Sequence, residues 1–105
     1  MSSPIDDELN VILIKRAKPK LKPPSRYKVL LLNDDYTPMD FVIAILEKIF
    51  KKTTSEAEAI MLEVHKTGKG IAGVYPFDIA STKLQLAIQW ARHKEHPLTL
   101  KLEKE

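Results

Sequence analysis

The strongest constraint on the fold is the order in which apolar periodicities change between residues 27 and 105. Residues 27–32 and 71–75 are short apolar runs rich in strand formers, and residues 98–102 alternate leucine with polar residues. Three longer segments between these runs carry apolar residues at helical spacing. The sequence therefore predicts the order β-α-α-β-α-β. In so short a chain this order favours an α+β fold, a single small domain with a three-stranded antiparallel sheet packed against three helices.

Residues that favour helix ends indicate where these helices begin and stop. Thr37 is predicted to cap the first helix, and Pro38 suits its first position because a proline there loses no intrahelical hydrogen bond. The second helix is expected to start within residues 53–56, which combine a cap with an acid, and to end at Gly68. The third is expected to open at Pro76.

The first 26 residues differ from the rest in composition and charge. Residues 15–25 alternate lysine with proline, which removes backbone donors and predicts an extended, disordered segment. The net charge of +3 lies wholly in residues 1–26, because residues 27–105 hold eleven basic and eleven acidic residues. We therefore divide the chain into a flexible tail, residues 1–26, and a folded core, residues 27–105. The core has no overall positive charge that would attract nucleic acid.

Nothing in the composition points to a membrane or to an oxidising compartment. The apolar run at residues 11–14 is far shorter than the ~20 residues of a membrane-spanning helix, and acidic residues precede it. The role of this run is left open. The chain has no cysteine, which excludes disulfides and is compatible with a reducing compartment. We expect a cytoplasmic protein.

Two patterns that suggest cofactor binding or catalysis have simpler explanations. Residues 68–73 match G-x-G-x-x-G, but a helix precedes this motif and a strand follows it, the reverse of the order that dinucleotide binding requires. A helix stop and a tight turn explain these glycines. His65 with Asp34 and Asp35 could ligate a metal in principle, although the other histidines have no acidic partners at ligand spacing. We expect no cofactor, no metal and no catalytic residue, and keep a metal-dependent hydrolase as an alternative.

An acceptor-rich turn and one histidine suit a different ligand. Asn33, Asp34 and Asp35 follow the first strand, and His65 lies at the edge of the apolar stripe of the second helix. Taken alone, His65 is more simply a core-edge histidine bonded to a carbonyl. If the fold brings it beside the turn, acceptors and apolar side chains together suit a primary ammonium on a hydrophobic group. An α-amino group, with a pKa of about 8, on an N-terminal Leu, Phe, Tyr or Trp is such a ligand.

The residues around this turn resemble the ClpS family of N-degron adaptors. The similarity is carried by residues 22–29 and above all by residues 33–39, the heptad NDDYTPM, followed by residues 61–65 and 95–98. The heptad is highly specific, and the pieces follow in order over residues 22–104 without evident gaps. The resemblance implies a non-enzymatic adaptor that binds substrates with N-terminal Leu, Phe, Tyr or Trp. It would deliver them to a ClpA-type AAA+ unfoldase, which feeds the ClpP peptidase. The resemblance also implies a monomer in the cytoplasm of a bacterium.

The resemblance also implies a role for individual residues. Asn33 and His65 would bond directly to the α-ammonium of the substrate, while Asp34 and Asp35 would supply negative charge and further bonds. Six residues would form the wall and rim of a pocket for the first side chain: Thr37, Met39, Val42, Met61, Val64 and Leu98. Spacing alone would assign these apolar side chains to the core instead. In the family, methionine at the position of Met39 is associated with the rejection of β-branched first residues.

The unfoldase would dock around the start of the third helix, which carries Asp78 and Lys83, and the tail would assist hand-off by entering the unfoldase pore. The sequence does not rank Leu, Phe, Tyr and Trp, and it does not distinguish a ClpA-type from a ClpC-type unfoldase. The alternative function left open is a small nucleic-acid-binding domain that acts through the basic tail, whose binding would weaken steeply with salt.

Overall fold

The computed structural model describes residues 24–105. The expected extended segment and the apolar run at residues 11–14 therefore lie outside the described residues, apart from Pro24 and Ser25. The predicted element order is confirmed, and its bounds are β1 (Arg26–Leu32), α2 (Met39–Lys48), α3 (Thr54–Thr67), β2 (Lys69–Pro76), α4 (Phe77–His93) and β3 (Thr99–Lys104). No helix among these residues is long and apolar enough to cross a membrane.

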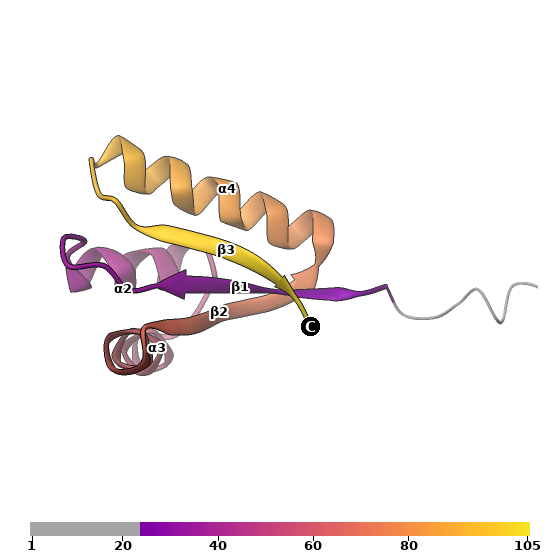
Figure 1. Ribbon diagram of the computed structural model, residues 1–105, viewed down its shortest axis with the longest axis horizontal. Coiled ribbons are helices and arrows are strands. Elements are labelled where there is room, and N and C mark those ends of the chain that lie inside the picture. Colours follow the sequence, from indigo (N-terminus) through magenta and orange to yellow (C-terminus); the bar gives the residue numbers. More distant parts are fainter. Residues whose placement is uncertain (1–23) are drawn as a thin grey trace, which may run out of the picture.

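The three strands form one antiparallel sheet with β1 in the middle, in the order β2-β1-β3. The predicted fold class and sheet are thus confirmed. Figure 1 shows α4 running along one side of the sheet and α3 lying next to β2, with α2 behind. α4 contacts all three strands, while α2 packs against α3.

The core lies between the sheet and the helices. On β1, Val29 and Leu31 are fully buried, as are Ile45 and Leu46 on α2. On α4 the buried stripe consists of the small residues Ala80, Ala87 and Ala91. Because alanine has a short side chain, α4 can lie close to the sheet. This alanine stripe is therefore the buried face of α4.

The predicted ends of α3 are confirmed, whereas the predicted cap of α2 is wrong. The Thr53 hydroxyl accepts from the Glu56 amide at 3.1 Å and the Glu56 carboxylate accepts from the Thr53 amide at 2.9 Å, a capping box. α3 ends at Gly68, whose φ of 93° is a conformation that glycine adopts readily. At α2, however, Pro38 is the cap residue and no side chain caps the helix.

Candidate functional site

The candidate site lies where the pairing of β1 with β3 stops. The last pair at this end joins Leu32 to Thr99. Beyond that pair Asn33 and Leu98 are no longer part of the ladder, and the chain on each side turns away. A cavity of about 390 Å³ opens there between residues 33–38, α2 and α3.

This one cavity is lined by all ten residues that the family resemblance assigned to an amine site and a pocket: Asn33, Asp34, Asp35, Thr37, Met39, Val42, Met61, Val64, His65 and Leu98. The structure adds four lining residues that we had not assigned: Leu31, Leu32, Tyr36 and Pro38. Two of the four, Tyr36 and Pro38, belong to the NDDYTPM heptad, so the heptad itself was the available signal. The acceptor-rich turn and the histidine therefore lie on the same side of the molecule.

Asp34 organises the turn that follows β1. Its Oδ1 accepts hydrogen bonds from the amides of Tyr36 at 2.8 Å and Thr37 at 2.7 Å, and its Oδ2 accepts from the Thr37 hydroxyl at 2.8 Å. The Thr37 hydroxyl thus donates to Asp34, and it does not cap α2 because the helix begins at Met39 and Pro38 takes the cap position. Partial burial raises the pKa of Asp34, but these hydrogen bonds and the nearby His96 outweigh burial and hold the pKa below its ordinary value.

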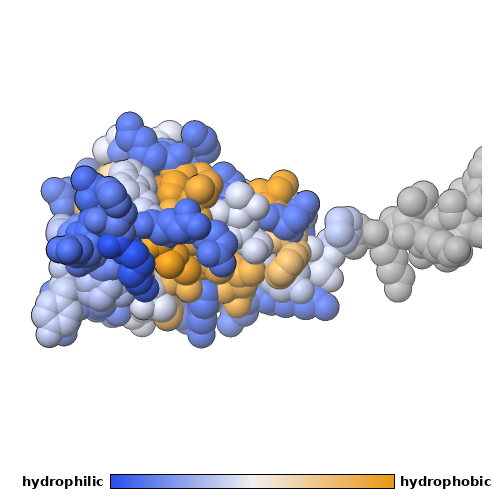
Figure 2. Space-filling model, turned by 90° about the horizontal axis from the view of Figure 1, so that it is seen from above, coloured by the Kyte–Doolittle hydropathy of each residue, from blue (hydrophilic) through white to orange (hydrophobic). Residues whose placement is uncertain are grey.

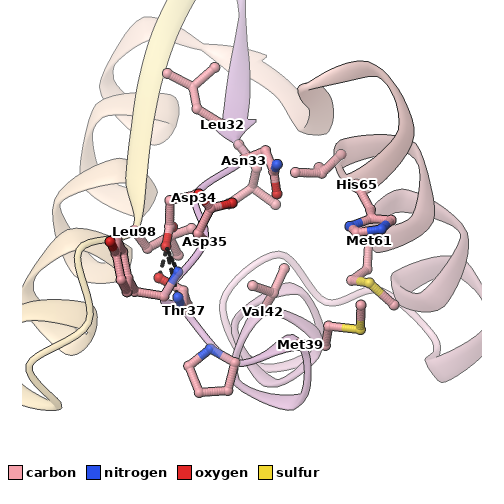
Figure 3. Close-up of a pocket in the computed structure, with 14 residues that line it drawn as sticks. Leu32, Asn33, Asp34, Asp35, Thr37, Met39, Val42, Met61, His65 and Leu98 are labelled. Atoms are coloured by element: carbon pink, nitrogen blue, oxygen red, sulfur yellow. Dashed lines mark hydrogen bonds between the residues drawn. The ribbon is translucent and has the colours of Figure 1, made fainter.

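Asn33 faces the cavity from the turn after β1, and His65 faces it from α3. The Asn33 amide N–H donates to the Gly68 carbonyl at 2.9 Å, which ties the turn to the end of α3. His65 lies on α3 less than one turn before Gly68. Figure 3 shows the Asn33 side-chain amide and the His65 ring both directed toward the cavity. Both residues are exposed, so a ligand can reach their nitrogen and oxygen atoms from solvent.

The rest of the cavity wall is apolar. Val42, Val64 and Leu98 are buried, with 8%, 6% and 2% of their surface exposed. In Figure 3 the side chain of Leu98 lies across the cavity from Met61 and His65, and the thioether of Met39 lies below that of Met61. Met39 is 51% exposed, so its flexible side chain stands at the mouth. The cavity thus combines an apolar wall with acceptors along its rim.

Asp35 differs from its neighbour Asp34. Its side chain is exposed and accepts no hydrogen bond from any residue in the described part of the chain. Its negative charge can therefore act on a cation that enters the cavity. Within residues 24–105 no cluster of three or more acidic, cysteine or histidine side chains is arranged to hold a metal ion.

Asp78 and Lys83 do not line the cavity and lie on α4. Asp78 is exposed in the first turn, where its Oδ1 accepts from the Ile79 amide at 3.0 Å. The Lys83 ammonium donates to the carbonyl of Ile49 at 2.7 Å and lies 5.3 Å from the ring centroid of Tyr75. The two residues are therefore on one helix, but the Lys83 ammonium already has a partner within the chain.

A second, larger cavity of about 620 Å³ lies between α3 and strands β1 and β2. Its lining includes Lys28, Lys69, Glu63 and Glu103, so its charges balance, and Lys28 is 3.9 Å from Glu103. The larger volume does not make it the better candidate, because none of the residues that the sequence assigned to the amine site or the pocket lines it.

Comparison with known proteins gives a consistent picture. A family model described as "ATP-dependent Clp protease adaptor protein ClpS" matches residues 22–101. A ClpS adapter protein from Herminiimonas arsenicoxydans is 57% identical over 91 residues, which cover 87% of this chain and 89% of that protein. One from Rhodospirillum centenum is 50% identical over 93 residues, covering 89% and 86%. The solved structure of Agrobacterium tumefaciens ClpS2 bound to L-phenylalaninamide is similar at a TM-score of 0.76 and 36% identity. It covers 79% of this chain and 100% of that one.

Proposed function

This chain belongs to the ClpS family of adaptors of the ATP-dependent Clp protease, and from that premise we propose that it recognises the first residue of substrate proteins. The ligand is a free α-amino group together with a large apolar side chain, as in N-terminal Leu, Phe, Tyr or Trp. The observation that carries the proposal is the single cavity in which an acceptor rim adjoins an apolar wall. As an adaptor, the protein is not an enzyme.

The chemistry of a known ligand in the family supports this proposal. The Agrobacterium ClpS2 structure holds L-phenylalaninamide, a molecule with a free α-amino group and a phenyl side chain. That pair of groups matches the two parts of the cavity in this chain. The α-amino group is mostly an ammonium at neutral pH and needs acceptors, and the phenyl group needs an apolar wall.

The roles of the rim residues follow from their environment. The side-chain oxygen of Asn33 and a ring nitrogen of His65 accept hydrogen bonds from the ammonium. Asp35, whose carboxylate has no partner in residues 24–105, supplies most of the negative charge. Asp34 adds charge but acts mainly by holding the turn, because three donors of the turn occupy its carboxylate.

The magnitudes fit a ligand that is captured and later released. Burial of one large apolar side chain is worth roughly 1.5 to 3 kcal/mol. Each hydrogen bond to a charged group adds roughly 1.5 to 3 kcal/mol. Association costs at least ~4 kcal/mol. With three such bonds, the upper ends of these ranges leave a balance of about −8 kcal/mol, which corresponds to micromolar affinity.

The partner of the adaptor is a ClpA-type unfoldase that feeds ClpP, and its docking surface is the start of α4. Asp78 is exposed there, and the flanking Phe77 and Ile79 are 55% and 45% exposed. Figure 2 looks down on the α4 side and shows hydrophobic patches between hydrophilic residues. Lys83 belongs to the same surface, although its ammonium is bonded to Ile49. Arg26 is the first residue of β1, so the tail that assists hand-off at the unfoldase pore in this proposal consists of residues 1–25.

The deciding experiment is a fluorescence-anisotropy titration with peptides that differ only in the first residue. A peptide beginning with free Leu or Phe binds, and its acetylated form does not. Asn33→Ala and His65→Ala abolish binding without loss of folding. His93→Ala is the matched control, because His93 is an exposed histidine at the end of α4 that does not line the cavity. Equal binding of the acetylated peptide would exclude recognition of the ammonium.

A further inference from the structure

One arginine is hydrogen-bonded to the connection between α4 and β3, which carries the cavity residue Leu98. Arg92 lies in the last turn of α4. Its Nη1 donates to the carbonyl oxygen of His96 at 2.8 Å and to that of Leu98 at 2.9 Å. One guanidinium nitrogen carries two hydrogens, so a single group bridges two carbonyls of the connection between α4 and β3.

The sheet does not hold Leu98 in this position. β3 begins at Thr99, and Leu98 lies just outside the pairing of Thr99 with Leu32. In residues 24–105 none of the backbone hydrogen bonds outside the helices and strands involves Leu98. The residue before it, Pro97, has no N–H to donate. The bond from Arg92 is therefore the interaction that fixes the Leu98 carbonyl.

The start of the same connection is held by other contacts. The His96 amide donates to the Ala91 carbonyl at 2.8 Å, and the His96 ring packs edge-on against Phe41 at a centroid distance of 4.6 Å. Glu95 turns the chain with a φ of 63°, a conformation that costs energy in residues other than glycine. The segment thus leaves α4 through a strained turn, and the Arg92 bond reaches across it to its last residue.

We propose that Arg92 is a positioning residue that holds Leu98 against the cavity and thereby sets the depth available to the first side chain of a substrate. Arg92 itself does not line the cavity, so it acts through Leu98. This inference rests on the proposed function of the same site. Its consequence is specific: loss of Arg92 affects recognition of the apolar side chain and leaves recognition of the α-amino group intact.

The test is Arg92→Met, which removes the donors but keeps a long apolar stem. In anisotropy titrations with fluorescein-labelled peptides, binding of peptides that begin with Phe or Trp weakens about three- to tenfold, as expected for one lost hydrogen bond that positions a wall. Binding of the Leu peptide weakens less, and acetylation abolishes binding of every peptide as before. Arg92→Lys, which keeps a cationic donor, restores part of the loss.

Two further measurements separate positioning from general destabilisation. Arg26→Met is the matched control, because Arg26 makes an exposed ion pair with Glu105 at the other end of β1. This substitution leaves the affinity for every peptide of the series unchanged. In a Leu98→Ala background, Arg92→Met has little further effect, because the wall it holds is already gone. Equal weakening of all peptides, or additive effects of the two substitutions, would overturn the inference.

The outcome also distinguishes this inference from the proposed function. If the unsubstituted protein binds no peptide with a free amino terminus, the proposed function fails. The positioning of Leu98 by Arg92 is then tested by the methyl resonances of Leu98 in nuclear magnetic resonance spectra. A shift of these resonances in Arg92→Met but not in Arg26→Met supports the positioning role, and unchanged resonances in both variants overturn it.

Discussion

Asp34 and Asp35 are adjacent in the sequence but differ in their hydrogen bonding. The carboxylate of Asp34 accepts three hydrogen bonds from Tyr36 and Thr37, while that of Asp35 is exposed and faces no donor in the described residues. The two acids are equivalent in a sequence motif and become distinct only when the turn is formed. We therefore assign turn geometry mainly to Asp34 and ligand charge mainly to Asp35.

The assignment of Asp34 predicts a pH-dependent stability. The pKa of Asp34 in the folded protein lies below its ordinary value of 3.8, because the turn's hydrogen bonds and His96 outweigh burial. A lowered folded pKa means that the ionised carboxylate stabilises the protein above the ordinary value and that this contribution is lost as pH falls through the folded value. Asp34→Asn should lower the free energy of unfolding at pH 7 by about 1 to 2 kcal/mol.

Urea unfolding at pH 7 and at pH values down to 3 measures this effect. The stability difference between the parent and Asp34→Asn should shrink toward the acid end of the range. Asp35→Asn is the matched control and should leave stability unchanged, because its carboxylate makes no bond in residues 24–105. A difference for Asp34→Asn that stays constant over the whole range would contradict the assignment.

The position of Met39 leads to a prediction about which N-terminal residues of a peptide bind poorly. Met39 stands half-exposed at the mouth of the cavity, beside the buried Val42. If the rim holds the α-amino group as proposed, the second branch of a β-branched first residue lies next to the backbone, close to the mouth, where the Met39 side chain stands. Met39→Ala should therefore raise the affinity for Ile and Val peptides relative to the Leu peptide, by about tenfold if one steric contact of ~1.4 kcal/mol is relieved.

The measurement is the ratio of dissociation constants for Ile and Leu peptides. Leu62→Ala is the control, since Leu62 is exposed on α3 to a similar degree, 48%, but does not line the cavity. An unchanged ratio in Met39→Ala would assign the selectivity elsewhere.

At the scale of whole elements, Lys83 fastens α4 to the end of α2. Its ammonium bonds to the Ile49 carbonyl, at the C-terminal end of α2 where the helix dipole favours a cation, and it also lies over the Tyr75 ring of β2. Lys83→Met should lower the free energy of unfolding by about 1 to 3 kcal/mol. Lys101→Met, at an exposed position of β3, should not. If Lys83→Met were as stable as the parent, the bond to Ile49 would not contribute to stability, and docking would be the only role left for Lys83.

The elements also show what could be predicted from sequence and what could not. Both ends of α3 were predictable, because Thr53, Glu56 and Gly68 act within one turn of the helix end. The cap of α2 was mispredicted, because the helix begins at Met39 and Pro38 takes the cap position, while the Thr37 hydroxyl donates to Asp34. Spacing alone predicted only the cap, and the bond between Thr37 and Asp34 became apparent only in the folded turn.

Longer-range relations had no local signal at all. β2 begins at Lys69, two residues before the predicted start, because Lys69 pairs with Leu32 of β1. The bond between Lys83 and Ile49 joins residues 34 positions apart. The set of cavity residues was obtained from a specific motif and a family resemblance. The hydrogen bonds of Arg92, in contrast, depend on the directions of the His96 and Leu98 carbonyls. Such backbone directions cannot be inferred from residue types.

At the scale of the whole molecule, β1 separates the two proposed binding surfaces. At one end of this seven-residue strand Leu32 leads into the cavity, and at the other end Arg26 pairs with Pro76, next to the start of α4. At about 3.3 Å per residue the strand spans roughly 20 Å. The described chain enters the sheet at Arg26, at the docking end of β1 rather than at the cavity (Figure 1).

This separation predicts that a substrate and the unfoldase bind at the same time without competing. A labelled Phe peptide should bind with the same dissociation constant to the free adaptor and to adaptor saturated with a ClpA-type unfoldase, held with a non-hydrolysable ATP analogue. Asp78→Lys should weaken binding of the unfoldase and leave peptide affinity unchanged, while Asn33→Ala should do the reverse. Displacement of the peptide by the unfoldase would mean that the two surfaces overlap, which the length of β1 between them argues against.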